Sequence, residues 1–211
     1  MVRIKICGIT RPDAVEAINQ CGVDMAGFVF HKASPRHLSD DVAAQLAAQC
    51  DPHIHRIALL VDPDDAAIDT ALGAISPAYL QLHGNETPAR IAEIKSRTHC
   101  GIIKALHIAA IQDFAACADY ADNVDLFLFD SKPAIGHLAG GRGVSFDWKL
   151  IKAYDKSRPY LLAGGLSPDN VREALKQSQA SMVDISSGVE SAPGVKDPDL
   201  ITAFVDKVRS I

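Results

Sequence analysis

One thiol stands where it could take part in acid–base chemistry. Cys7 ends the alternating segment 3–7, and Gly8 follows it before a helical pattern begins. Side chains at such strand-to-helix turns are exposed to a site more often than those inside elements. Free cysteine is also among the most often buried residues and then acts as a small hydrophobe. The segment alone favours burial, so a catalytic role for Cys7 requires partners elsewhere in the chain.

A carboxylate ends the apolar run 126–129, where packing does not call for one. If Asp130 is partly buried at the mouth of a pocket, its pKa can be raised, and it can hold a proton to donate. Asp130 as an acid and Cys7 as a base could then flank one substrate.

Two glycine-containing loops in the last quarter of the chain predict a phosphate site. Gly164 and Gly165 precede a predicted helix start at Ser167-Pro168, and Ser187 and Gly188 follow a predicted strand. Glycines let a phosphate approach the backbone, and free N–H groups at a helix start attract an anion. A tight turn is the alternative for a single Gly-Gly pair, but two such loops favour phosphate.

The histidines do not predict a metal centre. His53 and His55 are spaced like a metal pair but precede a strand, at the end of the sheet away from the expected site. His31, His83 and His107 follow or end strands, without a helical histidine pair or clustered carboxylates beside them. We therefore expect no metal site.

The elements that position these residues alternate along the chain. Period-2 apolar runs predict eight strands, near residues 2–7, 25–30, 55–61, 79–82, 101–106, 125–130, 159–163 and 182–186. Helix starts are predicted at Thr10, Ser39, Asp62-Pro63, Asn85, Ser167-Pro168 and Asp197-Pro198, where oxygen side chains or prolines suit free N–H groups.

Eight strand–helix units predict a compact α/β fold, a single (β/α)8 TIM barrel over residues 1–211. An open doubly wound sheet is the alternative, but no G-x-G-x-x-G follows the first strand. In a barrel, chemistry belongs at the carboxyl ends of the strands, where Cys7 and Asp130 lie. The irregular stretch 131–145 follows the sixth strand, and a long loop there is expected to be functional.

Strand parity predicts a buried ion pair inside the barrel. Lys5 shares a strand face with Cys7, while Ile4 and Ile6 face the helices. An unpaired ammonium inside the barrel would be costly, and Asp184 on the eighth strand can pair with it. We expect a structural pair within roughly 6 Å across adjacent strands.

Composition excludes several classes of protein. The 211 residues are 48% hydrophobic with a net charge of −5, which is typical of a globular domain and not of a nucleic-acid binder. No apolar run approaches the roughly 20 residues of a membrane helix, and a cytoplasmic location is expected. The five cysteines contain no C-x-x-C pair and are expected to be reduced. The expected partner is a small molecule.

These motifs together resemble the phosphoribosylanthranilate isomerase family of tryptophan biosynthesis over nearly the whole chain. The shared segments are Lys5-Ile6-Cys7-Gly8-Ile9-Thr10, Gly27-Phe28-Val29-Phe30, Ser34-Pro35-Arg36, Gln81-Leu82-His83-Gly84, Phe129-Asp130-Ser131, Phe146-Asp147-Trp148, Leu162-Ala163-Gly164-Gly165-Leu166 and Val183-Asp184-Ile185-Ser186-Ser187-Gly188-Val189-Glu190. Their order and spacing, more than any one of them, carry the resemblance.

The resemblance implies a cofactor-independent Amadori rearrangement of N-(5-phosphoribosyl)anthranilate to 1-(2-carboxyphenylamino)-1-deoxyribulose 5-phosphate. Asp130 would be the general acid and Cys7 the general base, and Arg36 would face the anthranilate carboxylate. The remaining substrate-binding residues that it implies are His83, Gly141, Gly164, Gly165, Ser187 and Gly188.

Two points of the resemblance stay open. Arg142 stands where the family usually has serine or threonine, and an unperturbed thiol near pKa 8.5 needs help to act as a base at neutral pH. Another phosphosugar isomerase or epimerase barrel, or a non-catalytic phosphosugar-binding barrel, is the alternative function. Either a monomer or a homodimer is compatible with the sequence.

Overall fold

The computed structural model describes residues 1–131 and 147–211, and its central feature is a closed barrel of eight parallel strands. The strands are β1 (Arg3–Cys7), β2 (Met25–Val29), β3 (His55–Leu60), β4 (Tyr79–Leu82), β5 (Gly101–Ile108), β6 (Leu126–Ser131), β7 (Tyr160–Leu162) and β8 (Met182–Ile185). They pair in sequence order, and β8 closes on β1. The predicted (β/α)8 barrel and its eight strands are confirmed.

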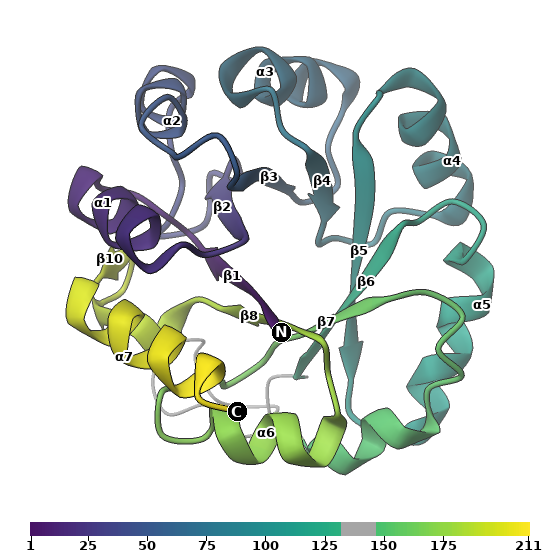
Figure 1. The fold of residues 1–211 in the computed structure, drawn as a ribbon. Coiled ribbons are helices and arrows are strands. Elements are labelled where there is room, and N and C mark those ends of the chain that lie inside the picture. Colours follow the sequence, from purple (N-terminus) through teal and green to yellow (C-terminus); the bar gives the residue numbers. More distant parts are fainter. Residues whose placement is uncertain (132–146) are drawn as a thin grey trace.

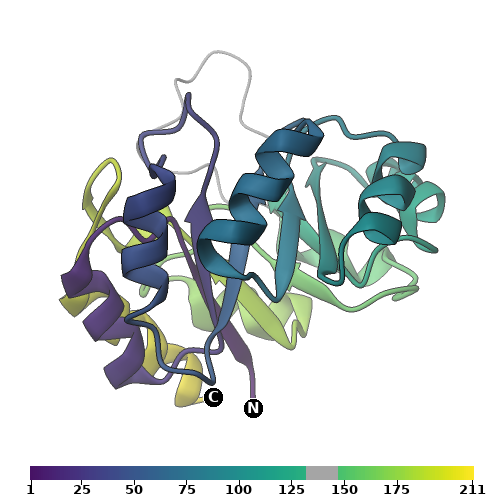
Figure 2. The same ribbon diagram turned by 90° about the horizontal axis from the view of Figure 1, so that it is seen from above.

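Helices surround the barrel (Figures 1 and 2). The α-helices are α1 (Pro12–Cys21), α2 (Asp40–Ala47), α3 (Asp65–Ile75), α4 (Pro88–Arg97), α5 (Cys117–Tyr120), α6 (Val171–Ser178) and α7 (Pro198–Arg209). Short 3-10 helices are η1 (Ile111–Ala116), η2 (Trp148–Ala153) and η3 (Ser187–Val189), and β9 (Glu190–Ala192) pairs with β10 (Val195–Lys196) as a hairpin after β8. None of the described helices has the length and apolar character needed to cross a bilayer.

The regular alternation of strands with full α-helices is weaker in the second half of the barrel. The connection from β5 to β6 holds η1 and the four-residue α5, and the described part of the connection from β6 to β7 holds only η2. Phe114, Tyr154 and Tyr160 cover the outer face of the barrel here, with Phe114 edge-on to Phe129 at a ring-centroid distance of 5.2 Å. Large aromatic rings thus provide the covering that full helices provide elsewhere.

Several helices begin later than predicted. Helix α4 is capped by Thr87, whose side chain accepts a hydrogen bond from the Arg90 N–H, and not by Asn85. Helix α3 is capped by Asp64, and α6 begins at Val171 after a turn that follows Ser167. The start at Asp197 is confirmed, because its carboxylate accepts from the N–H groups of Asp199 and Leu200. A proline near the helix start thus indicates the correct region of the sequence. Which side chain caps the helix depends on the path of the preceding loop.

The barrel wall separates two hydrophobic clusters. The larger cluster fills the space between strands and helices and contains Ile4 and Ile6. The smaller one fills the barrel interior and includes Met25, Ile103 and Leu128. Lys5 lies on the interior face, and its Nζ is 2.9 Å from Asp184 Oδ1, as strand parity predicts.

Candidate active site

Cys7 is buried and also lies at the carboxyl end of a strand. Burial and a catalytic role, the two interpretations of this residue, therefore do not exclude each other. It is 5% exposed and pairs in register with Gly27 of β2. A Cβ at Gly27 would lie 2.8 Å from Cys7 Sγ, closer than carbon and sulfur can pack. The missing side chain at Gly27 therefore makes room for the thiol.

The surroundings of Cys7 do not lower its pKa below the ordinary value. Burial raises the pKa of the thiol, and the positive charges of Lys5 and Lys196 offset this only in part. Lys5 is also bound to Asp184, whose negative charge raises the thiol pKa further. The net shift of the Cys7 pKa is upward, which favours the neutral thiol in the substrate-free protein.

Asp130 lies at the carboxyl end of β6, which is separated from β1 by the two strands β7 and β8. Its side chain is 29% exposed, which matches the predicted partly buried position. His83, in the loop after β4, lies beside it, with Nε2 3.7 Å from Asp130 Oδ2. The structure therefore brings His83 and Asp130 together at the catalytic end of the barrel.

Arg36 is held by a carboxylate that was not predicted from the sequence. Arg36 Nε and Nη2 donate to Glu190 Oε1 and Oε2 at 2.6 and 2.7 Å. Lys196 Nζ donates to the same carboxylate at 2.5 Å. Burial raises the pKa of Glu190, the bonds from Arg36 and Lys196 lower it, and the net shift is downward. Arg36 thus uses one edge of its guanidinium inside the protein, and Nη1 and the second Nη2 hydrogen lie on the other edge.

The loops after β7 and β8 touch each other through their backbones. A Cβ at Gly188 would overlap the Leu166 carbonyl oxygen, so only glycine allows this approach. Gly164 and Gly165 have φ values of 82° and 67°, in the region that favours glycine. Within residues 1–131 and 147–211, no acceptor takes a hydrogen bond from the N–H of Gly164 or Gly165. Two donors in this double loop are thus available for an anion.

One expected feature of the phosphate loops is different in the structure. Helix α6 begins at Val171 and not directly after Gly165, because Asn170 bridges the turn by accepting from Ser167 N and donating to the Gly165 carbonyl. The expected donors for a phosphate here are therefore the backbone N–H groups of Gly164 and Gly165 themselves. The N–H groups at the start of α6 lie further along the chain. Of the other expected site residues, Gly141 lies outside the described residues, as do Arg142 and most of the stretch 131–145.

His83 is connected to the barrel interior through Gln81. Gln81 Nε2 lies 3.1 Å from His83 Nδ1, and Gln81 Oε1 accepts from Lys5 Nζ at 2.7 Å. The ring of His107 stands beside that of His83, with a centroid distance of 5.6 Å. Gln81 lies within the predicted strand 79–82, but its bond to Lys5 and the contacts of Glu190 and Lys196 could not be predicted from the sequence.

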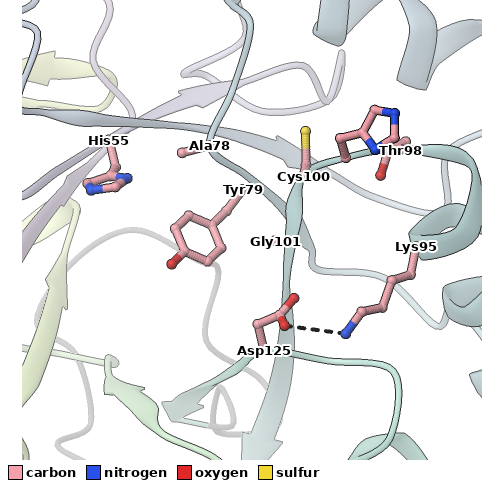
Figure 3. Close-up of a pocket in the computed structure, with 9 residues that line it drawn as sticks. His55, Ala78, Tyr79, Lys95, Thr98, Cys100, Gly101 and Asp125 are labelled. Carbon is pink, nitrogen blue, oxygen red and sulfur yellow. Dashed lines mark hydrogen bonds and ion pairs between the residues drawn. The ribbon is translucent and has the colours of Figure 1, made fainter.

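A cavity at the opposite end of the barrel is shown in Figure 3. His55, Tyr79 and Gly101, which begin β3, β4 and β5, line it together with Lys95 and Asp125. Lys95 and Asp125 form an ion pair of 3.3 Å across it. His55 therefore lies at the amino end of β3, away from Cys7 and Asp130 at the carboxyl ends of their strands, as predicted.

Comparison with known proteins agrees with this geometry. Residues 4–207 match the family model of N-(5'phosphoribosyl)anthranilate (PRA) isomerase. The chain is 47% identical over 210 residues to N-(5'-phosphoribosyl)anthranilate isomerase of Paracoccus denitrificans, covering 99% of this chain and 98% of the relative. It is 45% identical to the enzyme of the same name from Caulobacter sp., and both chains are covered completely.

Solved structures show the same relationship. Phosphoribosyl anthranilate isomerase from Thermotoga maritima superposes with a TM-score of 0.90 at 33% identity, over 100% of both chains. A structure of phosphoribosyl anthranilate isomerase in complex with reduced 1-(o-carboxyphenylamino)-1-deoxyribulose 5-phosphate gives a TM-score of 0.87 at 32% identity, again over 100% of both chains. The matched model and these relatives cover the barrel from its first strand to its last helix, and the chain belongs to the N-(5'-phosphoribosyl)anthranilate isomerase family.

Proposed function

We propose that this protein catalyses the Amadori rearrangement of N-(5-phosphoribosyl)anthranilate to 1-(2-carboxyphenylamino)-1-deoxyribulose 5-phosphate in tryptophan biosynthesis. The observation that carries the proposal is the placement of Cys7 and Asp130 at the carboxyl ends of β1 and β6 of one closed barrel. Family membership supports the same substrate. We expect the protein to act in the cytoplasm as a monomer or a homodimer, without metal or cofactor.

The first step is opening of the ribose ring. Asp130 donates its proton to the ring oxygen, the bond from C1 to that oxygen breaks, and the nitrogen lone pair forms an iminium double bond to C1. The carboxylate that remains on Asp130 lies 3.7 Å from His83 Nε2. A general acid so placed contributes roughly 10² to 10⁴ in rate.

The second step is removal of a proton from C2. Cys7 first loses its thiol proton to solvent, and the thiolate then takes the proton from C2. The C2–H electrons form the C1–C2 double bond, and the iminium electrons return to nitrogen. The resulting enolamine becomes the ketone when C1 is protonated and the C2 hydroxyl loses its proton. Burial raises the pKa of Cys7, but the iminium cation is an opposite charge beside the thiol and favours its ionised form.

Arg36 and the double loop supply the binding contacts in this proposal. The edge of the Arg36 guanidinium that faces away from Glu190 suits the planar anthranilate carboxylate, and the N–H groups of Gly164 and Gly165 suit the phosphate. Ser187 and Gly188 belong to the same cradle because their loop lies against Leu166.

The direct test is turnover of the substrate, followed by the fluorescence change of the anthranilate group. Cys7→Ser and Asp130→Asn should each lower kcat by roughly 10² to 10⁴. Cys117→Ala is the matched control, because Cys117 is equally buried, at 2% exposure, but lies in α5. Near-normal turnover of either site variant would remove that residue from the mechanism, and a wild-type protein without turnover would overturn the function.

Binding of a reduced product analogue tests the remaining contact. Affinity should survive Cys7→Ser and fall by roughly tenfold or more in Arg36→Ala, because a bidentate charged contact is lost. Arg11→Ala, which removes an exposed arginine paired with Asp13, is the control. An unchanged affinity in Arg36→Ala would exclude Arg36 from the substrate site.

A further inference from the structure

Gln81 can adopt only one amide orientation. Lys5 Nζ is a donor without acceptor capacity, it is fully buried, and it lies 2.7 Å from Gln81 Oε1. Lys5 Nζ also donates to Asp184 Oδ1, at 2.9 Å. Turning the amide would place an NH2 group against a buried ammonium, so the oxygen of Gln81 must face Lys5.

The orientation of Gln81 fixes the proton of His83. With its oxygen on Lys5, Gln81 presents its NH2 group to His83 Nδ1 at 3.1 Å. Nδ1 must then accept, and a neutral imidazole that accepts at Nδ1 carries its hydrogen on Nε2. That nitrogen lies 3.7 Å from Asp130 Oδ2.

We infer that Gln81 is a positioning residue, which with Lys5 holds His83 as an Nε2–H donor directed at Asp130. The catalytic role of Asp130 in this inference rests on the proposed function. When Asp130 gives its proton to the ring oxygen, a carboxylate is left, and the Nε2–H of His83 lies 3.7 Å from one of its oxygens. His83 keeps its own proton throughout this step.

The charges around His83 agree with a neutral ring. His107 stands beside the ring, and Asp130 of β6 lies 3.7 Å from its Nε2. Lys5 of β1, Lys104 on the outer face of β5 and Glu86 of the loop after β4 act on it through their charges. Burial, followed by the effects of His107, Lys5 and Lys104, lowers the pKa of His83 to about 4. The ring therefore has one hydrogen near neutral pH, and the hydrogen bond from Gln81 decides which nitrogen carries it.

The same hydrogen bond opposes a metal ion at this place. His83, His107 and Asp130 each offer a ligand atom, and these atoms lie within 4.8 Å of one another. A metal on His83 Nε2 would require the hydrogen on Nδ1, where it would meet the NH2 group of Gln81. Turning Gln81 to relieve that contact would put the NH2 group against Lys5.

The test is the protonation state of each imidazole nitrogen, read from nitrogen chemical shifts in histidine-labelled protein without substrate. The His83 signals are identified by their loss in His83→Gln. Wild type should show a protonated Nε2 and an unprotonated Nδ1. In Gln81→Glu a carboxylate faces both Lys5 and Nδ1, so the hydrogen should move to Nδ1 and the pKa of His83 should rise by roughly one unit or more.

Two further variants keep the test decisive. Gln81→Met removes the donor while leaving the volume similar, and His83 should then show a mixture of both neutral forms. Gln45→Glu makes the same substitution at an exposed position of α2 and should leave the His83 signals unchanged. A wild-type His83 protonated on Nδ1, or signals that Gln81→Glu and Gln81→Met both leave unaltered, would overturn the inference.

Kinetics provide a separate readout. Gln81→Glu and Gln81→Met should lower kcat by about tenfold, the scale of one lost hydrogen bond to a charged group, with a smaller effect on KM. An unchanged kcat in both would overturn the role of Gln81 in catalysis. If wild type shows no turnover, the proposed function fails, while the nitrogen shifts still decide the placement of the proton.

Discussion

Two buried lysines on opposite faces of the barrel wall use the same kind of partner for different purposes. Lys5 lies inside the barrel and bonds to Asp184 and Gln81, whereas Lys104 lies on the outer face and bonds to Glu86 and the Gly84 carbonyl, each at 2.7 Å. Lys104 also stands 5.8 Å from the centre of the Tyr120 ring. Both ammonium groups are shielded from water, and both have a carboxylate.

The difference lies in what each pair holds. Glu86 accepts from the backbone N–H groups of Asp62 and Gly84, so the outer pair fixes the path of two loops. The inner pair holds Gln81, a side chain that reaches His83. On the outer face of the sheet the buried ion pair thus fixes the backbone of loops. On the inner face it fixes the orientation of a site residue.

The largest expected effect comes from breaking the two pairs in parallel. Removing one partner of a buried ion pair costs about 3–5 kcal/mol, so Lys5→Met and Lys104→Met should both lower the free energy of unfolding in urea by about this amount. Lys95→Met breaks the exposed pair with Asp125 and should cost at most about 1 kcal/mol. Without urea, where both variants are folded, kcat should fall roughly tenfold further in Lys5→Met than in Lys104→Met. Equal losses of kcat would remove the distinction between the two faces.

The next effect concerns pH and sharpens the description of the inner face. The pKa of His83 is lowered to about 4 from an ordinary value of 6.5, so between these values the unfolded chain binds more protons than the folded one. Stability should therefore fall with pH from about 6.5 to about 4, by about 2–3 kcal/mol from this residue. Urea unfolding at about pH 7 and about pH 4.5 should show a smaller decrease in His83→Gln than in wild type. An identical decrease would show that His83 is not held neutral.

The smallest effect compares two glycines. A Cβ at Gly27 would lie 2.8 Å from Cys7 Sγ, whereas one at Gly73 of α3 would meet nothing within 4 Å. Gly27→Ala should cost about 1–3 kcal/mol through overpacking and should also lower kcat. Gly73→Ala should stabilise the protein by up to about 1 kcal/mol through helix propensity, without a change in kcat. Thermal unfolding and turnover measure both, and a harmless Gly27→Ala would show that the thiol has room to move.

The sequence predicts the features that follow from periodicity. All eight strands and the pair of Lys5 with Asp184 follow from alternation, because residues two apart share a face and neighbouring strands of a barrel place such faces together. Helix starts are predicted less well. Asn85 does not cap α4, since its N–H donates to Asp62 Oδ1 at 2.6 Å, while Glu86 turns toward Lys104.

Contacts between distant loops cannot be predicted this way. Arg36 and Glu190 are 154 positions apart, and Glu190 and Lys196 face each other only because β9 and β10 form a hairpin after β8. No period in the sequence links these segments. The proton position of His83 likewise depends on three side chains from different strands and loops.

The bond between Glu190 and Arg36 has a consequence for the thermodynamics of binding. A free arginine loses up to about 2 kcal/mol of side-chain entropy when it is ordered. Here the side chain is already ordered by Glu190 and packed against Gly8, where a Cβ would come within 2.5 Å of Arg36 Cδ. That entropy is lost when the chain folds, so a carboxylate that reaches Arg36 meets a rigid group and binds with a smaller entropic penalty.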